Sequence, residues 1–242
     1  MDTKRYARQI AVDVFGKNGQ HLLSKKHITI IGAGGLGSHS AAILVRMGIG
    51  SLTIIDNDVI DVSNLHRTSI FTEEDVQQSK IRILTKRLRK INSGTILTGI
   101  EDRITKNNFL SLIKNTDVLL DGTDSMATRY LINEISIQQK IPWVYGGVDG
   151  TVGMVLGIIP KKTPCLSCIS QTLQEKRGTV PVLGNVPLQI ASIQCTEALK
   201  ILLHQTLAGF ILYDTWKQHF EVLDIKRNTT CQICSKEHFK YL

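Results

Sequence analysis

Residues 27–56 read HITIIGAGGLGSHSAAILVRMGIGSLTIID, and this stretch decides the fold. A β-rich run, HITII, ends at Gly32, and the residues that follow are small and apolar at helical spacing. SLTIID (51–56) is then a second run typical of a buried strand. Strand, glycine turn, helix and strand in this order predict the first unit of a parallel α/β sheet.

Three glycines of this turn, Gly32, Gly34 and Gly37, match the needs of a phosphate-binding loop. Glycine allows a tight turn, close approach of the backbone to a phosphate, and close packing of the helix on the strand. Free N–H groups at the start of the helix favour an anion. Asp56 ends the next strand, where a carboxylate can accept hydrogen bonds from ribose hydroxyls. The context predicts a mononucleotide or dinucleotide site rather than a purely structural turn.

Apolar strands and helical patterns continue to alternate along the first half of the chain. Helices are expected at about 77–91, 106–114 and 126–139, and strands at 95–100, 117–122 and 142–147. This is the rhythm of βαβ units in a doubly wound parallel sheet.

The pattern changes after Gly150. TVGMVLGIIP (151–160) is expected to be a strand in a different arrangement, and a turn-rich connection follows with a crossover loop at about 169–186. A helix beginning at Pro187 and two antiparallel strands within 211–225 complete the chain. The predicted fold class is α/β, with a Rossmann-like, mostly parallel sheet, antiparallel C-terminal strands and a four-cysteine zinc knuckle.

Length and composition suit one domain. The 242 residues are 42% hydrophobic, which is enough for a proper core and excludes a disordered or fibrous chain. We expect a single domain over 1–242, with an N-terminal helical segment (1–26), a nucleotide-binding half (27–150) and a second half (151–242). The first residues lack an apolar leader and no stretch suits a membrane span, so a cytoplasmic protein without a membrane partner is expected.

The net charge of +8 is compatible with nucleic acid, an acidic protein or a polyphosphate ligand, and its sign does not choose among them. Part of the excess lies in LTKRLRK (84–90), whose spacing indicates the solvated face of an amphipathic helix.

Four of the five cysteines form two Cys-x-x-Cys pairs, Cys165/Cys168 and Cys231/Cys234. Two residues between thiolates let one tight turn direct both sulfurs to a tetrahedral centre, and two such knuckles supply four ligands. We predict one closed, structural zinc site rather than disulfides or redox pairs. Cys195 lies in the apolar helix at a core-like phase and is expected to be a buried small hydrophobe.

Further motifs occur in a recognisable order: RYARQ (5–9), SNLHR (63–67), Lys80 after an FTEEDV segment, DGTDS (121–125) and the paired knuckles. With the glycine turn, they make the chain resemble the ThiF/MoeB/HesA family of E1-like adenylyltransferases from Arg5 to Cys234. In that family ATP activates the C-terminal Gly-Gly carboxylate of a ubiquitin-like sulfur carrier, ThiS- or MoaD-like, as an acyl-adenylate. The resemblance implies release of pyrophosphate, thiamine or molybdopterin biosynthesis, a homodimer and a carrier-binding second half. No nucleic-acid partner is expected, because the cysteine pairs lack histidine ligands at zinc-finger spacing.

The chemistry of that reaction explains the residue types. A carboxylate that attacks the α-phosphorus of ATP brings two anions together, so cations and Mg²⁺ are needed where charge develops. Arg67 and Lys80 can contact phosphates. The resemblance implies that Asp124 holds Mg²⁺ and that Arg8 reaches the neighbouring protomer's site. It implies an ATP site formed by Gly32, Gly34, Gly35, Gly37, Asp56, Asp58, Ser63, Asn64, Leu65, His66, Arg67, Lys80, Asp124 and Ser125.

Structural interpretations of single residues stay open. Taken alone, Lys80 could be a solvated helix residue, Arg67 an exposed loop cation, and Asp124 the cap of a helix beginning near Met126. Adenylation of an ionised carboxylate needs no general base, so His39 and His66 receive no catalytic role.

Two departures from the family pattern stand out. Several relatives carry a cysteine used in sulfur transfer in the crossover loop, where this chain has Arg177, and Ser125 stands where asparagine is usual. The first puts a covalent sulfur-transfer step in doubt. The second keeps a hydrogen-bonding group but shortens its reach, which weakens a contact to adenine or phosphate. The alternatives to adenylation are an NAD-dependent oxidoreductase, which would share the glycine turn and Asp56, and a non-catalytic basic zinc-containing binding protein.

Overall fold

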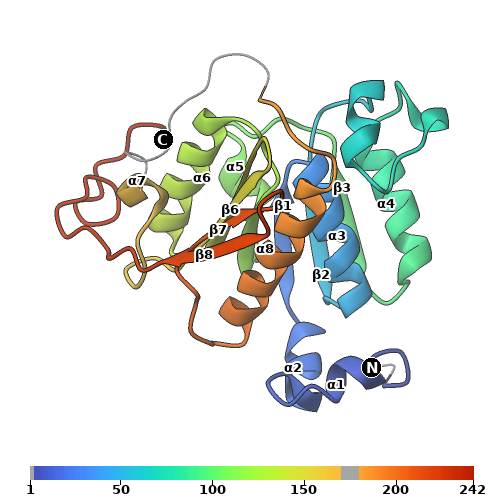
Figure 1. Ribbon diagram of the computed structural model, residues 1–242, viewed down its shortest axis with the longest axis horizontal. Coiled ribbons are helices and arrows are strands. Elements are labelled where there is room, and N and C mark those ends of the chain that lie inside the picture. Colours follow the sequence, from blue (N-terminus) through green and yellow to red (C-terminus); the bar gives the residue numbers. More distant parts are fainter. Residues whose placement is uncertain (1–2, 170–179) are drawn as a thin grey trace.

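The computed structural model describes residues 3–169 and 180–242, and its centre is one eight-stranded sheet (Figure 1). The strand order across the sheet is β3-β2-β1-β4-β5-β6-β7-β8. The strands are β1 (His27–Ile31), β2 (Ser51–Ile55), β3 (Ile96–Ile100), β4 (Val118–Asp121), β5 (Trp143–Asp149), β6 (Val152–Ile158), β7 (Phe210–Asp214) and β8 (His219–Leu223). The first five are parallel and the last three antiparallel, which confirms the predicted fold class.

Helices cover both faces of this sheet. They are α1 (Ala7–Ile10), α2 (Gly16–Leu23), α3 (Gly35–Met47), α4 (Lys80–Ile91), α5 (Phe109–Leu112), α6 (Met126–Gln139), α7 (Leu166–Ile169) and α8 (Val186–Leu202), with 3₁₀ turns η1 (Val62–Arg67) and η2 (Glu73–Asp75). Within 3–169 and 180–242, no helix combines the length and the hydrophobicity that crossing a bilayer requires.

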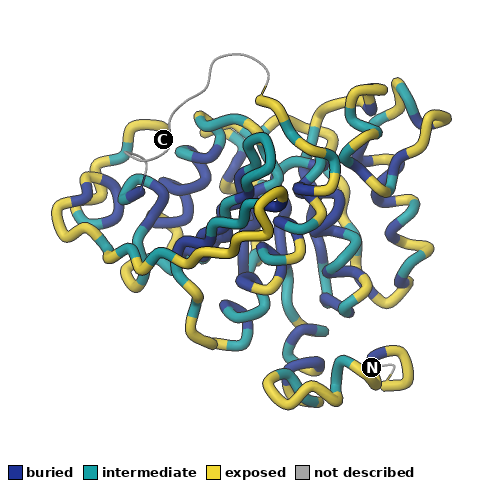
Figure 2. The backbone as a smooth tube through the Cα atoms, viewed as in Figure 1, coloured by how far each residue is buried: buried dark blue, intermediate teal, exposed yellow. Residues whose placement is uncertain are grey.

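Two apolar cores, one on each face, follow from alternation along the strands. Ile28 and Ile30 of β1 pack with α3, α4 and α8, whereas Ile31 packs in the core that α6 covers. Because successive strand residues point to opposite faces, a fully buried parallel strand is apolar at nearly every position. Figure 2 shows the resulting buried centre and the exposed outer segments.

The strand order reverses beside β1, with β2 and β3 on one side and β4 and β5 on the other. In open α/β sheets, ligands bind outside the carboxyl ends of the strands at such a switch point. The glycine loop (residues 32–37) follows β1 at this edge, and loop 121–125 follows β4. The topology alone therefore brings two of the predicted motifs together.

Several element boundaries differ from the sequence prediction. α4 begins at Lys80 rather than near 77, because the Ser79 side chain accepts a hydrogen bond from the N–H of Arg82 and caps the helix there. α5 is a single turn, and β5 continues to Asp149 before a tight turn at Gly150. The sheet is continuous from β5 into β6, so the division into functional halves near 150 stays a prediction.

Gly37 tests the closeness of α3 to β1. A Cβ atom at Gly37 would lie 1.8 Å from the carbonyl oxygen of Gly32, which is a main-chain atom and cannot rotate away as a side chain can. We expect Gly37→Ala to lower the free energy of unfolding by about 2 kcal/mol or more, as overpacking does. Urea unfolding of the unliganded protein measures this loss, and a wild-type midpoint would contradict the packing argument.

Candidate functional site

The glycine loop has the shape of a phosphate cradle. Gly32 has a φ of +96°, and a Cβ there would lie 2.5 Å from the carbonyl oxygen of Gly122. Gly34 caps α3, and a Cβ on Gly34 would meet nothing within 4 Å. The first position thus requires glycine for the fold, whereas the second leaves space beside the N–H groups that begin α3. That space fits a phosphate held by a helix N-terminus.

Asp56 is held against this loop by two backbone hydrogen bonds. Its Oδ2 accepts the N–H of Ala33 at 2.6 Å, and its Oδ1 accepts the N–H of Asp58 at 2.7 Å. Burial raises the pKa of Asp56, although Lys80 and the two N–H donors act in the opposite direction. Each carboxylate oxygen has a lone pair to spare, so the ribose-binding role predicted for Asp56 is geometrically open.

Lys80 extends from the start of α4 toward the same edge. Its side chain is only 9% exposed, and Nζ lies 2.8 Å from Oδ2 of Asp58, which is itself 61% exposed. The backbone N–H of Lys80 also donates to the carbonyl of Asp58. The interpretation of Lys80 as a solvated helix residue is therefore wrong. Its buried stem directs the ammonium group to a fixed place beside Asp58 and Asp56.

The SNLHR segment forms the compact turn η1. Asp61 caps it, accepting the N–H of Ser63 at 2.8 Å, while Asn64 Oδ1 accepts the N–H of Asp61 at 3.3 Å. Arg67 Nη1 donates to the carbonyl of Ser63 at 2.5 Å, and His66 Nδ1 lies 2.9 Å from the same oxygen. The turn therefore fixes the direction of Arg67 and leaves the amide NH₂ of Asn64 as a donor for an anion.

η1 is packed between the glycine loop and the start of α8. A Cβ at Gly35 would lie 3.1 Å from Pro187 and 3.5 Å from the carbonyl oxygen of Arg67. A Cβ at Gly184 would lie 2.3 Å from the carbonyl oxygen of His66. Glycine at both positions is what lets these three segments approach, so tertiary packing sets the position of η1.

His39 joins α3 to the residues that follow η1. Its Nε2 accepts the N–H of Ser69 at 3.2 Å, which leaves the proton on Nδ1 for the carbonyl of Gly35 at 2.6 Å. Burial lowers the pKa of His39 and keeps the ring neutral. Both ring nitrogens are thus occupied by structural hydrogen bonds.

Loop 121–125 places Asp124 at the carboxyl end of β4. The Oγ of Ser125 accepts the N–H of Thr128 at 3.3 Å and caps α6, so the interpretation of Asp124 as the cap is wrong. Asp124 itself is exposed. Serine is a good capping residue, so the capping of α6 explains why serine suits position 125.

Beneath this loop lies a polar network that the sequence analysis did not single out. Asp121 is fully buried and pairs with Arg129 of α6, and Gln194 of α8 donates to the carbonyls of Asp121 and Val144 at 2.7 and 3.0 Å. The available signal was a polar residue among the mostly apolar buried residues of α8, as at Gln194. Buried polar groups need partners, so such residues mark specific contacts.

Arg8 lies apart from this assembly. It is exposed on α1, whose neighbouring residue Gln9 donates to the carbonyl of Met47 at the end of α3. The glycine loop is at the start of this 13-residue helix, and thus about 20 Å away. In Figure 1, α1 and α2 extend from one end of the molecule. The fold brings the glycine loop, Asp56, η1, Lys80 and loop 121–125 to one edge, but not Arg8.

The two Cys-x-x-Cys knuckles meet at a single point, as predicted. The Sγ–Sγ distances are 3.8 Å for Cys165–Cys168 and Cys165–Cys231 and 3.5 Å for Cys168–Cys234, and all four sulfurs lie within 4.8 Å of one another. A tetrahedron with Zn–S bonds of about 2.3 Å has edges of about 3.8 Å. The four thiols therefore fit a closed zinc site.

Helix α6 supports both knuckles. The N–H of Leu166 donates to Asn133 Oδ1 at 3.0 Å, and the N–H groups of Lys240 and Tyr241 donate to the buried Glu134 carboxylate at 2.7–2.9 Å. Cys195 lies elsewhere, in the core of α8, and burial raises the pKa of its thiol to about 12. It is therefore the buried small hydrophobe that the sequence predicts.

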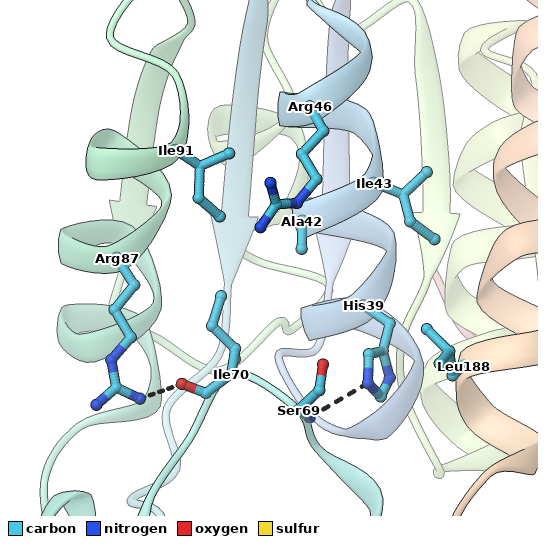
Figure 3. A pocket seen from close by; sticks show the side chains of 9 residues that line it. All are labelled: His39, Ala42, Ile43, Arg46, Ser69, Ile70, Arg87, Ile91 and Leu188. Carbon is cyan, nitrogen blue, oxygen red and sulfur yellow. Dashed lines mark hydrogen bonds between the residues drawn. The ribbon is translucent and has the colours of Figure 1, made fainter.

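A surface cavity of about 420 Å³ lies between α3 and α4 (Figure 3). It is lined by His39, Ala42, Ile43, Arg46, Ser69, Ile70, Arg87, Ile91 and Leu188. None of the predicted nucleotide-binding residues lines it. The cavity is thus distinct from the edge at which the motifs converge.

Comparison with known proteins agrees with this geometry. The model of the ThiF family matches residues 6–233. The chain belongs to the ThiF family. The resemblance inferred from the motifs is thereby confirmed.

Two relatives match nearly the whole of this chain. The chain is 34% identical to the sulfur carrier protein ThiS adenylyltransferase of Bacillus subtilis, over 99% of this chain and 74% of the relative. It is 33% identical to the SAMP-activating enzyme E1 of Haloferax volcanii, over 96% of this chain and 88% of the relative.

The crystal structure of Escherichia coli MccB with MccA-N7isoASN superimposes with a TM-score of 0.85. The match covers 95% of this chain and 74% of that chain at 23% sequence identity. At this level of identity the likeness supports the fold alone.

The zinc site can be tested by metal content. We expect one zinc per chain in the wild-type protein, and loss of most of it together with a lower Tm in Cys234→Ser, because a closed site needs all four thiolates. Elemental analysis and thermal unfolding measure both effects. Cys195→Ala is the matched control and should keep full zinc. Full zinc occupancy in Cys234→Ser would contradict the four-thiolate site.

Proposed function

We propose that this ThiF-family chain is an ATP-dependent adenylyltransferase that activates the C-terminal Gly-Gly carboxylate of a ubiquitin-like sulfur carrier. The product is an acyl-adenylate, and pyrophosphate is released. The observation that carries the proposal is the convergence of the glycine loop, Asp56, η1 and Lys80 at one edge of the sheet. The relatives named as sulfur carrier adenylyltransferases support the substrate class.

Binding of ATP follows from the geometry of that edge. The phosphates would lie against the start of α3 beside Gly34, where the backbone leaves space. The ribose would lie at Asp56, whose carboxylate is oriented by Ala33 and Asp58. Open α/β sheets bind nucleotides in this arrangement.

The reaction forms one bond and breaks one. A carboxylate oxygen of the carrier tail attacks the α-phosphorus, and the bond between the α-phosphorus and the bridging oxygen breaks, so that pyrophosphate leaves. Arg67 and Lys80 would stabilise the negative charge that gathers on the phosphate oxygens. Both are held by the fold, Arg67 through Ser63 and Lys80 through Asp58. No general base is needed, because a C-terminal carboxylate is ionised at neutral pH.

Mg²⁺ and zinc have different roles in the proposal. Asp124 would hold Mg²⁺, which supplies charge neutralisation at the phosphates when bound, and an exposed carboxylate is a suitable donor for this hard cation. The four cysteines would hold zinc for structure only, since a closed tetrathiolate site offers no open position to a substrate.

The proposal includes a homodimer in which Arg8 acts in the partner's site. The support is its position, exposed and anchored near the end of α3 that is remote from its own glycine loop. A cytoplasmic location is also part of the proposal, because free thiols at a metal site suit a reducing compartment.

Thiamine and molybdopterin biosynthesis are the pathways proposed for the carrier. The proposal is confined to adenylation, because Arg177 stands where several relatives carry the sulfur-transfer cysteine. Arg177 lies outside the described residues.

The catalytic assignments are tested by ATP–pyrophosphate exchange with a panel of purified carriers ending in Gly-Gly. Asp124→Ala should abolish exchange, and Arg67→Ala and Lys80→Ala should each reduce it by about 10²-fold, as loss of a preorganised charge does. Lys86→Ala, an exposed lysine on the same α4, is the matched control and should retain exchange. Tail-truncated carriers should give none.

Outcomes against the assignments are equally clear. Unchanged exchange in Asp124→Ala would refute its role, and a loss below tenfold in Lys80→Ala would refute the role of that ammonium group. Exchange with truncated carriers would contradict activation of the carrier's C-terminal carboxylate.

Ligand-dependent unfolding separates ATP from NAD. ATP at about 100 times its Kd should add about 2.7 kcal/mol to the free energy of unfolding, and NAD should add none. Gly34→Val should lose the response to ATP while its unliganded Tm stays near wild type, because the added side chain enters open space beside α3. Thermal shift assays measure these effects. Stabilisation by NAD and not by ATP would favour the oxidoreductase instead.

A further inference from the structure

A buried ion pair lies directly beneath loop 121–125. The carboxylate of Asp121 is 0% exposed, and its Oδ2 accepts a hydrogen bond from Nε of Arg129 at 2.8 Å. Its Oδ1 accepts two hydrogen bonds at 2.9 Å, from the N–H and the hydroxyl of Thr123. A buried carboxylate is costly unless its charge and lone pairs are satisfied, and here both oxygens have partners.

The guanidinium of Arg129 also binds Thr123, at its carbonyl oxygen. Its Nη2 donates to the carbonyl of Thr123 at 2.6 Å and to that of Gly146 on β5 at 3.0 Å. The group lies 5.2 Å from the centre of the Tyr145 ring. The N–H, hydroxyl and carbonyl of Thr123 are therefore all fixed, and with them the peptide group that leads into Asp124.

Neighbouring backbone locks this arrangement to the nucleotide edge. The N–H of Gly122 donates to the carbonyl of Ile31 at 2.7 Å, and Gly122 lies against Gly32 of the glycine loop. Ser125 is fixed in turn as the cap of α6. Asp124 is thus an exposed carboxylate between two residues whose backbones are held in place.

We propose that Arg129 is a positioning residue that sets the Asp124 carboxylate at the place where it binds the divalent cation of the nucleotide complex. Arg129 is buried beneath the loop and touches neither nucleotide nor carrier in this proposal. The inference rests on the proposed function insofar as Asp124 is the metal ligand. Residues that orient a metal ligand typically contribute 10–100-fold to metal affinity.

Arg129→Lys is the informative substitution. Lysine keeps the positive charge beside Asp121, but its single ammonium group cannot reproduce the planar fork that reaches Asp121, Thr123 and Gly146 together. Any change in metal affinity then reflects geometry rather than net charge. Arg87→Lys is the matched control, because Arg87 of α4 likewise pairs with a buried aspartate, Asp75, and donates to a backbone carbonyl, that of Ile70.

Two readouts are needed, one without turnover. Mn²⁺ binding to the full chain in the presence of a non-hydrolysable ATP analogue is measured by electron paramagnetic resonance. The Mg²⁺ concentration for half-maximal ATP–pyrophosphate exchange is measured in parallel. Arg129→Lys should weaken Mn²⁺ binding and raise the Mg²⁺ requirement by about tenfold or more. Metal-free binding of the analogue should stay within about twofold, and Arg87→Lys should match wild type.

Thr123→Val provides a second, milder variant if Arg129→Lys fails to fold. It removes the hydroxyl that donates a hydrogen bond to Asp121, keeps the shape of the side chain and leaves Arg129 in place. It should shift the metal requirement in the same direction by a smaller factor. Wild-type metal binding in a folded Thr123→Val or Arg129→Lys protein, even with a lowered Tm, would overturn the inference and leave a purely structural ion pair.

The outcomes separate this inference from the proposed function. Wild-type exchange with unchanged metal dependence in both variants would overturn the inference alone. If no carrier supports exchange but the variants bind Mn²⁺ more weakly than the wild type, the inference is supported. The proposed carrier substrate is then rejected. Absence of nucleotide-dependent Mn²⁺ binding in the wild type would reject both.

Discussion

Backbone contact between the glycine loop and loop 121–125 is the constraint on which the nucleotide edge depends. The Cβ that Gly32, Gly37 or Gly122 lacks would collide with main-chain atoms of a neighbour. Main chain cannot yield as a flexible side chain can, so these segments meet only where side chains are absent. β1, β4 and α3 are thereby brought close enough for Asp56 and Asp124 to lie at one edge of the sheet.

Helix α6 connects this edge to the zinc knuckles. Its first turns carry the cap Ser125 and the buried Arg129, and its middle carries Asn133 and Glu134, which bind the backbone near both knuckles. Because a helix is rigid, the residues along it keep fixed positions relative to one another. The structural metal site and the predicted Mg²⁺ site therefore share one support, although their residues are far apart in the chain.

Sequence patterns predicted elements well where a local signal existed. The glycine turn, Asp56 and the paired knuckles were found because each has a fixed spacing with a physical cause. Boundaries shifted where a side chain decided them, as Ser79 did for α4. The burial of Lys80 was missed because an amphipathic pattern does not show that Asp58 lies beside the helix start. Arg129 and Gln194 were missed because their partners come from other elements.

The sequence by itself determined the fold class, the family and the two Cys-x-x-Cys pairs, because periodicity and spacing are local signals that extend over a few residues. Only the tertiary structure decided which polar groups are buried together. It separated Arg8 from its own nucleotide edge, assigned the cap of α6 to Ser125 rather than Asp124, and joined Asp121 to Arg129 beneath the loop. The physical reason is that burial and hydrogen-bond partners depend on segments distant in sequence, whose approach is set by packing.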